Sequence, residues 1–175
     1  MFNKILVAID QSKTHQKVFK HAVDLAQATG AKLMLLHVLS AEESTAPRLP
    51  TLTTLEYYPM DGKYFEDYQE RWQSYEKLGL ELLRSCVEKA MAMGVTAEFT
   101  QSAGTPGRAI CELAATWDAD LIILGRRGHS GLNELILGSV SNYVLHNAPC
   151  SVLTVQGNTN GDTDAPSEKH MATAS

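Results

Sequence analysis

The sequence predicts an α/β protein: a three-layer, doubly wound sheet of five parallel strands with helices on its faces. Two observations support this prediction. Short apolar runs alternate along the chain with longer amphipathic stretches, which is the pattern of parallel strands joined by crossover helices. In addition, 175 residues with 44% hydrophobic content are enough for one domain with a sizeable core. We therefore expect a single domain over residues 1–155.

The first strand, helix and second strand follow one another at the N-terminus. Segment 4–9 is apolar after its first residue, as is typical of a strand covered on both faces. Apolar residues then recur at helical spacing up to Gly30, where we expect the helix to end, because glycine readily adopts a left-handed conformation. The apolar segment 32–39 predicts the second strand.

A long loop and a long helix are expected next. Residues 40–63 lack periodicity and contain several prolines, which predicts a loop, and loops of this length are usually functional or mobile. Apolar residues then keep a helical period from Tyr68 to Ala90, and Gly94 is expected to end this helix. The alternation over 95–101 predicts the third strand.

The remaining elements are a helix, a strand, a helix and a strand. Thr105 followed by Pro106 predicts a helix start, because threonine is a common N-cap and proline suits the first helical position. The apolar run 121–124 predicts a buried fourth strand, and apolar residues over 136–144 predict the last helix. Segment 151–155 predicts the fifth strand.

The composition argues against several classes of protein. The net charge of −5 leaves no basic stripe, so no nucleic-acid partner is expected. No apolar run of membrane length and no signal segment occurs, so we expect a cytoplasmic protein without a membrane partner. Cys86, Cys111 and Cys150 lack metal-binding spacing and are expected to be buried, reduced core thiols. Residues 156–175 are polar and predict a disordered tail.

A glycine motif follows the predicted fourth strand. Gly125 and Gly128 are separated by two residues, and nine further residues separate Gly128 from Gly138 and Ser139. A strand, a glycine-bearing turn and a helix N-terminus together favour an anion, because backbone N–H groups point outward and the helix dipole adds positive charge. Glycines also let the backbone approach a ligand closely. The motif therefore predicts a phosphate site, most simply for a nucleotide.

This spacing resembles the nucleotide-binding signature of the universal stress protein family: Gly, two residues, Gly, nine residues, Gly, then Ser or Thr. The resemblance covers about Phe2 to Val155. It implies a flavodoxin-like (Rossmann-like) fold with strand order 3-2-1-4-5 and a bound adenine nucleotide. Four other segments look like the family's first, second, fourth and last strands, namely residues 4–12, 35–38, 119–125 and 148–155.

In a sheet of this order, ligands bind beyond the carboxyl ends of the strands, where the strand order reverses. That point lies between the first and fourth strands and brings Asp10 together with Gly125. Asp10 matches the family aspartate that accepts a hydrogen bond from ribose or adenine. It could also cap a helix that starts near Ser12, and the two roles are compatible. Gln11 departs from the small residue often seen after that aspartate, which could alter the ribose edge of the pocket.

The resemblance extends the predicted site to the walls of the base pocket and to the helix start. Ser139, Ser141 and the N–H of Val140 are expected to hold the terminal phosphates. Arg126 and Arg127 are open to two interpretations, since paired loop arginines either reach a phosphate or lie solvated at the surface. The residues predicted to contact the nucleotide are Ala8, Ile9, Asp10, Val38, Leu124, Gly125, Arg127, Gly128, Gly138, Ser139, Val140 and Ser141.

The expected ligand is ATP, with ADP or AMP as alternatives, and Mg²⁺ is expected to arrive with the nucleotide phosphates, because the histidines show no metal-binding spacing. No P-loop and no dinucleotide fingerprint occurs. His129 and Glu134 are the polar groups nearest the phosphates, but a charged residue near a helix start usually complements the dipole. No catalytic residue is predicted.

These features predict an ATP-binding universal stress protein that acts as a dimeric stress-response or signalling module. One alternative is a slow ATP hydrolase or phosphotransferase, which lacks an evident general base, although phosphoryl transfer depends largely on positioning. Another is a nucleotide-independent interaction protein, against which the intact glycine motif argues. The homodimer is expected to form through the apolar edge strand, whose residues are Ser151, Val152, Leu153, Thr154 and Val155.

Overall fold

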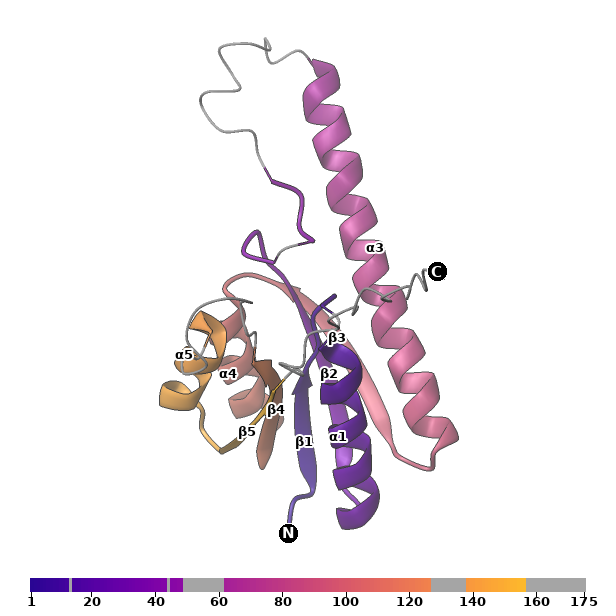
Figure 1. Cartoon of the computed structure of the whole chain (residues 1–175), viewed down its shortest axis with the longest axis vertical. Coiled ribbons are helices and arrows are strands. Elements are labelled where there is room, and N and C mark those ends of the chain that lie inside the picture. Colours follow the sequence, from indigo (N-terminus) through magenta and orange to yellow (C-terminus); the bar gives the residue numbers. More distant parts are fainter. Residues whose placement is uncertain (13, 44, 49–61, 127–137, 157–175) are drawn as a thin grey trace, which may run out of the picture.

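The computed structural model describes residues 1–12, 14–43, 45–48, 62–126 and 138–156. They form a five-stranded parallel sheet with the order β3-β2-β1-β4-β5, flanked by helices (Figure 1), which confirms the predicted fold class and strand order. The elements are β1 (Lys4–Ala8), α1 (His15–Thr29), β2 (Lys32–Leu39), α3 (Gly62–Ala92), β3 (Ala97–Ala103), α4 (Pro106–Trp117), β4 (Leu121–Arg126), α5 (Ser139–Asn147) and β5 (Ser151–Gln156).

Strand residues alternate between two cores, one on each face of the sheet. In β1, Ile5 and Val7 pack with α1 and α3, whereas Leu6 packs with α4 and α5. Figure 1 shows these two pairs of helices on opposite sides of the sheet. A strand covered on both faces must be apolar at every position, which explains the unbroken apolar runs in the sequence.

The strand ends differ from the predicted ends where pairing continues. β4 runs through Gly125 to Arg126, because these residues pair with Val155 and Gln156 of β5. β3 begins at Ala97, two residues later than predicted. Val95 instead donates its N–H to the Ala90 carbonyl oxygen at 3.0 Å and closes the end of α3, so its apolar character reflects burial beneath the helix.

Most of the predicted helix boundaries are confirmed. Gly30 ends α1 in the left-handed region (φ 74°) and donates its N–H to the Ala26 carbonyl oxygen at 2.8 Å. Gly94, also left-handed (φ 78°), follows α3. Thr105 is the N-cap of α4 and Pro106 its first residue, although the threonine hydroxyl makes no capping hydrogen bond.

Helix α3 is 31 residues long and covers the sheet with its C-terminal part only. The first buried side chain among its described residues is Tyr75, and the part before it projects beyond the sheet (Figure 1). The buried residues recur at helical spacing, and they are Tyr75, Gly79, Leu83, Cys86 and Ala90.

Some expectations concern residues outside the described part of the chain. Helix α3 takes the last two residues of the expected loop, residues 41–43, 45 and 46 form turns or bends, and residues 49–61 are not described. Of the expected tail, Gln156 belongs to β5 and the remainder is not described. Within the described ranges, no helix has both the length and the apolar character needed to cross a membrane.

The three cysteines are free thiols. Cys86 is buried as expected, whereas Cys111 and Cys150 are only half-buried against the core on the α4 and α5 face. Burial raises the pKa of each thiol above its ordinary value, which keeps the groups protonated and unreactive at neutral pH.

Candidate functional site

A cavity of about 220 Å³ lies at the carboxyl ends of β1, β2 and β4. This volume, enclosed by the described residues, is below the ~300–1,000 Å³ of typical ligand pockets. The cavity brings together ten of the residues predicted as the site: Ala8, Ile9, Asp10, Val38, Leu124, Gly125, Gly138, Ser139, Val140 and Ser141.

Two predicted site residues, Arg127 and Gly128, lie outside the described residues, as do His129 and Glu134. The other ten predicted site residues lie at one cavity because of the order of the strands in the sheet. The carboxyl ends of neighbouring parallel strands meet at the same edge of the sheet, and β1 pairs with both β2 and β4.

The N-terminus of α5 forms one wall of the cavity. Gly138 is the N-cap, with φ −59°, and Ser139 is the first helical residue. The buried Ser141 donates its hydroxyl hydrogen to the Gly125 carbonyl oxygen at 3.3 Å, which fastens α5 to the end of β4. A phosphate contact by Ser141 stays a prediction beside this structural bond.

Gly125 is also needed for packing. A Cβ atom at this position would lie 3.2 Å from Val18 Cγ2 and 3.3 Å from Thr14 Cγ2, both at the N-terminal part of α1. From the sequence, Gly125 is expected to let the backbone approach a ligand closely. The structure adds a reason that does not depend on a ligand, namely the close approach of α1 to β4.

Asp10 closes a tight turn after β1. Its Oδ1 accepts hydrogen bonds from the Ser12 N–H at 3.1 Å and from the Ser12 hydroxyl at 2.5 Å. Helix α1 begins only at His15, with Thr14 as its N-cap, so the expectation that Asp10 caps a helix starting near Ser12 is wrong. The turn nevertheless keeps the Asp10 side chain at the cavity.

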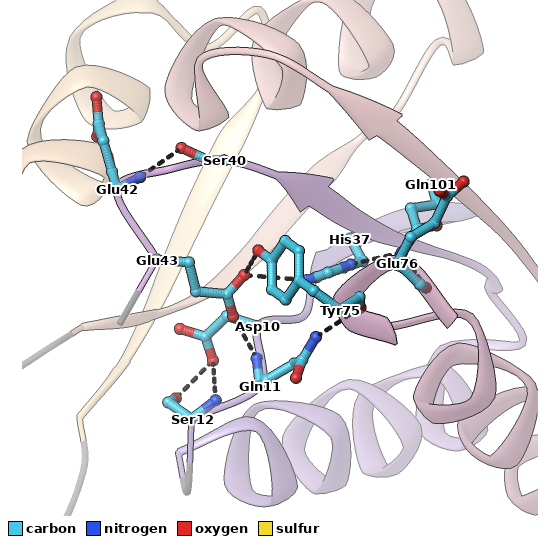
Figure 2. A network of polar contacts seen from close by, with 10 residues as sticks. All are labelled: Asp10, Gln11, Ser12, His37, Ser40, Glu42, Glu43, Tyr75, Glu76 and Gln101. Atoms are coloured by element: carbon cyan, nitrogen blue, oxygen red, sulfur yellow. Dashed lines mark hydrogen bonds and ion pairs between the residues drawn. The ribbon is translucent and has the colours of Figure 1, made fainter. Parts of the chain in front are cut away.

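Beside the cavity lies a buried polar cluster, which we call the Glu43 network; it consists of Gln11, His37, Glu43, Tyr75 and Gln101 (Figure 2). The Glu43 carboxylate is 5% exposed and accepts the Gln11 backbone N–H at 2.7 Å. It also accepts hydrogen bonds from His37 Nε2 at 3.1 Å and from the Tyr75 hydroxyl. One carboxylate thus joins the turn after β1, strand β2 and helix α3.

The network determines which nitrogen of His37 carries hydrogen. The Gln101 side-chain nitrogen lies 3.2 Å from the Glu76 carbonyl oxygen, which can only accept, so the amide is oriented with its NH₂ group inward. The same NH₂ group lies 2.8 Å from His37 Nδ1, which must therefore accept. The hydrogen of the imidazole is on Nε2, where it faces Glu43.

Glu43 is ionised at neutral pH. Burial by itself raises the pKa of its carboxyl group. Hydrogen bonds from His37, Tyr75 and the Gln11 backbone together lower the pKa by more than burial raises it, so the pKa lies below its ordinary value. The buried charge is tolerated because several donors surround it.

The sequence-based prediction missed several residues that line the cavity, among them His37, Ser40, Glu42 and Glu43. A histidine inside an otherwise apolar strand was a usable signal for His37. No local signal marks Glu43, because it follows β2 in the stretch without periodicity, and its partners range from Gln11 to Tyr75 in sequence.

Chemically, the cavity combines three kinds of surface. The backbone N–H groups and hydroxyls at the start of α5 suit an anion. The carboxylates that follow β1 and β2, among them Asp10 and Glu42, suit hydroxyl or amino donors, and apolar side chains such as Val38 and Leu124 suit a flat ring. No group of three or more His, Cys, Asp or Glu side chains among the described residues could hold a metal ion.

Comparison with known proteins places this arrangement in a family. The model of the universal stress protein family matches residues 1–156. The chain is 40% identical over 156 residues to the universal stress protein YxiE of Bacillus subtilis, covering 89% of this chain and 100% of that protein. It is 36% identical over 155 residues to the universal stress protein Sll1388 of Synechocystis, covering 89% and 98%.

The fold is shared with solved structures. The structure is similar to the universal stress protein UspA from Lactobacillus plantarum with a TM-score of 0.67 and 24% identity, covering 88% of this chain and 97% of that chain. The match to the family model, the identity to relatives over their full length and the strand order 3-2-1-4-5 agree. The chain belongs to the universal stress protein family.

Proposed function

We propose that this protein binds ATP in the cavity at the ends of β1, β2 and β4 and acts as a cytoplasmic, dimeric stress-response or signalling module. The observation that carries the proposal is the convergence of the α5 N-terminus with Asp10 and Val38 at one cavity. An N-terminus supplies donors for phosphates, whereas Asp10 is a suitable acceptor for ribose or adenine.

Solved relatives support an adenine nucleotide as the ligand. Universal stress proteins of similar fold have been solved with cAMP, with AMP (from Arabidopsis thaliana) and with dAMP (from Archaeoglobus fulgidus). In our proposal, Ala8, Ile9, Val38 and Leu124 enclose the base, and Gly125, Arg127 and Gly128 follow the ligand towards the phosphates. Gly138, Ser139, Val140 and Ser141 hold the phosphates themselves.

Mg²⁺ would accompany the nucleotide in this proposal. The described residues offer no ready metal cage, so the phosphate oxygens would supply most of the ligands, which is the usual way in which Mg²⁺ is held at nucleotide sites.

The test is calorimetric titration with ATP, ADP and AMP, each with Mg²⁺, on the wild type and on Gly138→Val. The backbone of Gly138 has a φ of −59°, which any residue adopts, so valine adds side-chain volume at the phosphate position without backbone strain. We expect the variant to lose ATP binding while its melting temperature stays close to that of the wild type.

Thr105→Val is the matched control, because Thr105 is the exposed N-cap of α4 at the same edge of the sheet, and its hydroxyl makes no capping bond. It should bind ATP as the wild type does. Equal ATP affinity in the wild type and in Gly138→Val would contradict the proposed position of the phosphates, and no binding of any of the three nucleotides would contradict the proposal as a whole.

A further inference from the structure

The Glu43 network is a continuous connection between the proposed nucleotide cavity and helix α3. Glu43 and His37 line the cavity, and both contact Tyr75 of α3: Glu43 by a hydrogen bond, and His37 with its ring 5.7 Å from the tyrosine ring at an edge-to-face angle of 68°. Gln11, next to Asp10, adds a second link, because its side-chain amide donates to the Tyr75 carbonyl oxygen at 3.2 Å. Figure 2 shows these groups converging on Tyr75.

Tyr75 lies where α3 leaves the body of the protein. It is the first buried side chain among the described residues of the helix, and the part before it projects beyond the sheet (Figure 1). That part rises about 1.5 Å per residue, so its tip lies on the order of 20 Å from Tyr75. A small rotation of the helix at Tyr75 therefore becomes a large displacement of the projecting end.

A row of aromatic rings continues from Tyr75 along the projecting part. The Tyr75 and Trp72 ring centroids are 5.3 Å apart, and those of Trp72 and Tyr68 are 6.3 Å apart, both at edge-to-face angles. The row begins at a ring that lines the cavity, since His37 contacts Tyr75. Trp72 thus sits one contact beyond the Glu43 network, where its fluorescence reports on the position of Tyr75.

We propose that Glu43 and Tyr75 are positioning residues that couple occupancy of the nucleotide cavity to the orientation of the projecting part of α3. The inference rests on the proposed function. A ligand in the cavity contacts the segments after β1 and β2, which carry Gln11 and Glu43. Leaving a buried carboxylate without its donors is strongly unfavourable, so Tyr75 follows when Glu43 moves. The projecting part of α3 is then the element through which the protein reports its nucleotide state.

The test follows Trp72 fluorescence during titration with ATP and Mg²⁺. The chain has two tryptophans, Trp72 and Trp117, so Trp117→Phe leaves Trp72 as the only reporter. We expect its fluorescence to change with the same midpoint as the calorimetric isotherm. If Trp117→Phe folds poorly, Trp72→Phe in the wild-type background gives the complementary result, namely loss of the nucleotide-dependent change.

Tyr75→Phe separates coupling from binding, because it removes the hydroxyl bonded to Glu43 and keeps the ring beside Trp72. Its ATP affinity should differ from that of the wild type by less than about fivefold, which is the lower end of typical allosteric coupling factors. The change in Trp72 fluorescence on ATP binding should be lost. Tyr68→Phe, at the far end of the row, is the matched control and should keep the response.

The outcomes separate this inference from the proposed function. If calorimetric titration detects no ATP binding to the wild type, both the proposed function and the coupling are overturned. ATP binding without a Trp72 response in the wild type would overturn the coupling alone. A Tyr75→Phe variant that keeps the full response, or that loses ATP affinity in proportion to the response, would also overturn it, because the network would then merely shape the cavity.

Discussion

At the scale of single residues, Glu43 is a buried charged group on which both the stability of the fold and its dependence on pH rest. Its carboxylate is buried, ionised at neutral pH, and bonded to His37, Tyr75 and the Gln11 backbone. Hydrogen bonds to a charged group contribute more than those between neutral groups, and the loss of any one leaves a buried charge with fewer donors. The residue therefore contributes both to stability and to its dependence on pH.

Glu43→Gln should lower the free energy of unfolding by about 1–3 kcal/mol at pH 7. Both carboxylate oxygens accept hydrogen bonds, so in either orientation the amide NH₂ group would face a donor, either the Gln11 N–H or those of His37 and Tyr75. Since the pKa of Glu43 is lower in the folded state, its contribution is complete above the ordinary value of 4.5 and is lost as the pH falls through the folded value. The difference in the free energy of unfolding between the wild type and Glu43→Gln should therefore become smaller below about pH 4.5.

Urea unfolding between pH 7 and pH 3 measures both effects. Glu42→Gln is the matched control, since Glu42 is the exposed neighbour of Glu43 and should change stability by less than about 0.5 kcal/mol. Two outcomes would show that Glu43 is not the buried charge described above. One is an equal loss of stability in Glu43→Gln and Glu42→Gln, and the other is a stability difference between wild type and Glu43→Gln that does not change with pH.

Hydrolysis of ATP should be far slower than the typical enzyme turnover of about 10 per second. Both ring nitrogens of His37 are engaged, by Glu43 and Gln101, and Asp10 Oδ1 holds Ser12, so these groups are poorly available as general bases. Steady-state phosphate release measures the rate, and Gly138→Val gives the background from contaminating enzymes. If the wild type releases phosphate near the typical enzyme rate and Gly138→Val does not, the protein is an ATP hydrolase rather than a binding module.

At the scale of elements, the contact between α3 and the sheet depends on Gly79. A Cβ atom there would lie 2.4 Å from both His37 Nδ1 and the Gln101 side-chain nitrogen. The absence of a side chain lets the helix approach the Glu43 network, and the same face continues through Leu83, Cys86 and Ala90 of the core. Glycine inside a helix normally reduces stability, so its presence here follows from packing rather than from propensity.

Gly79→Ala should destabilise the protein by about 1–2 kcal/mol, because overpacking costs about 1–3 kcal/mol and the gain in helix propensity offsets at most about 1. His37 and Gln101 cannot move aside cheaply, since each is hydrogen-bonded within the network. Denaturant unfolding checks this, with Gln73→Ala on the exposed face of α3 as the control. A variant more stable than the wild type would show that the helix contact is looser than described.

At the scale of the whole molecule, β5 is an edge of the sheet, as the strand order requires. Its side chains are not equally available to a partner: Val155 is buried beside α1 and Val152 packs on the opposite face, whereas Leu153 is 40% exposed. An edge strand presents unpaired backbone groups that a second copy can pair with by a two-fold contact. We therefore propose that Ser151, Val152, Leu153, Thr154 and Val155 form the homodimer interface.

Leu153→Lys should convert the dimer into a monomer, because a charge on the exposed face of an edge strand opposes pairing between copies. Light scattering at micromolar concentration measures the mass, which is 19.1 kDa for one chain. Lys32→Leu, an exposed residue at the start of the internal strand β2, serves as a control and should leave the mass unchanged. A monomeric wild type would rule out the interface, and a dimeric Leu153→Lys variant would place it elsewhere.

Local patterns were sufficient to predict the strands and helices, and the family resemblance supplied the strand order. The apolar strands, the left-handed glycines Gly30 and Gly94, and Pro106 at the start of α4 each express a preference of a short segment, and such preferences are visible without knowledge of the fold. The glycine motif around Gly125 and Gly138 belongs to the same class, because strand, turn and helix start adjoin in sequence. Topology then brought ten of the twelve predicted site residues to one edge of the sheet.

The Glu43 network, the point at which α3 leaves the sheet and the packing role of Gly125 were decided only by tertiary structure. Gln11, His37, Glu43, Tyr75 and Gln101 come from five separate segments. Although Gln11 and His37 stand out in their own segments, no local pattern shows that the five residues meet. Periodicity reports which face of an element is buried, but not which distant side chain supplies a buried carboxylate with its donors. That choice depends on how closely α3 approaches β2 and β3, which is a property of the packed molecule.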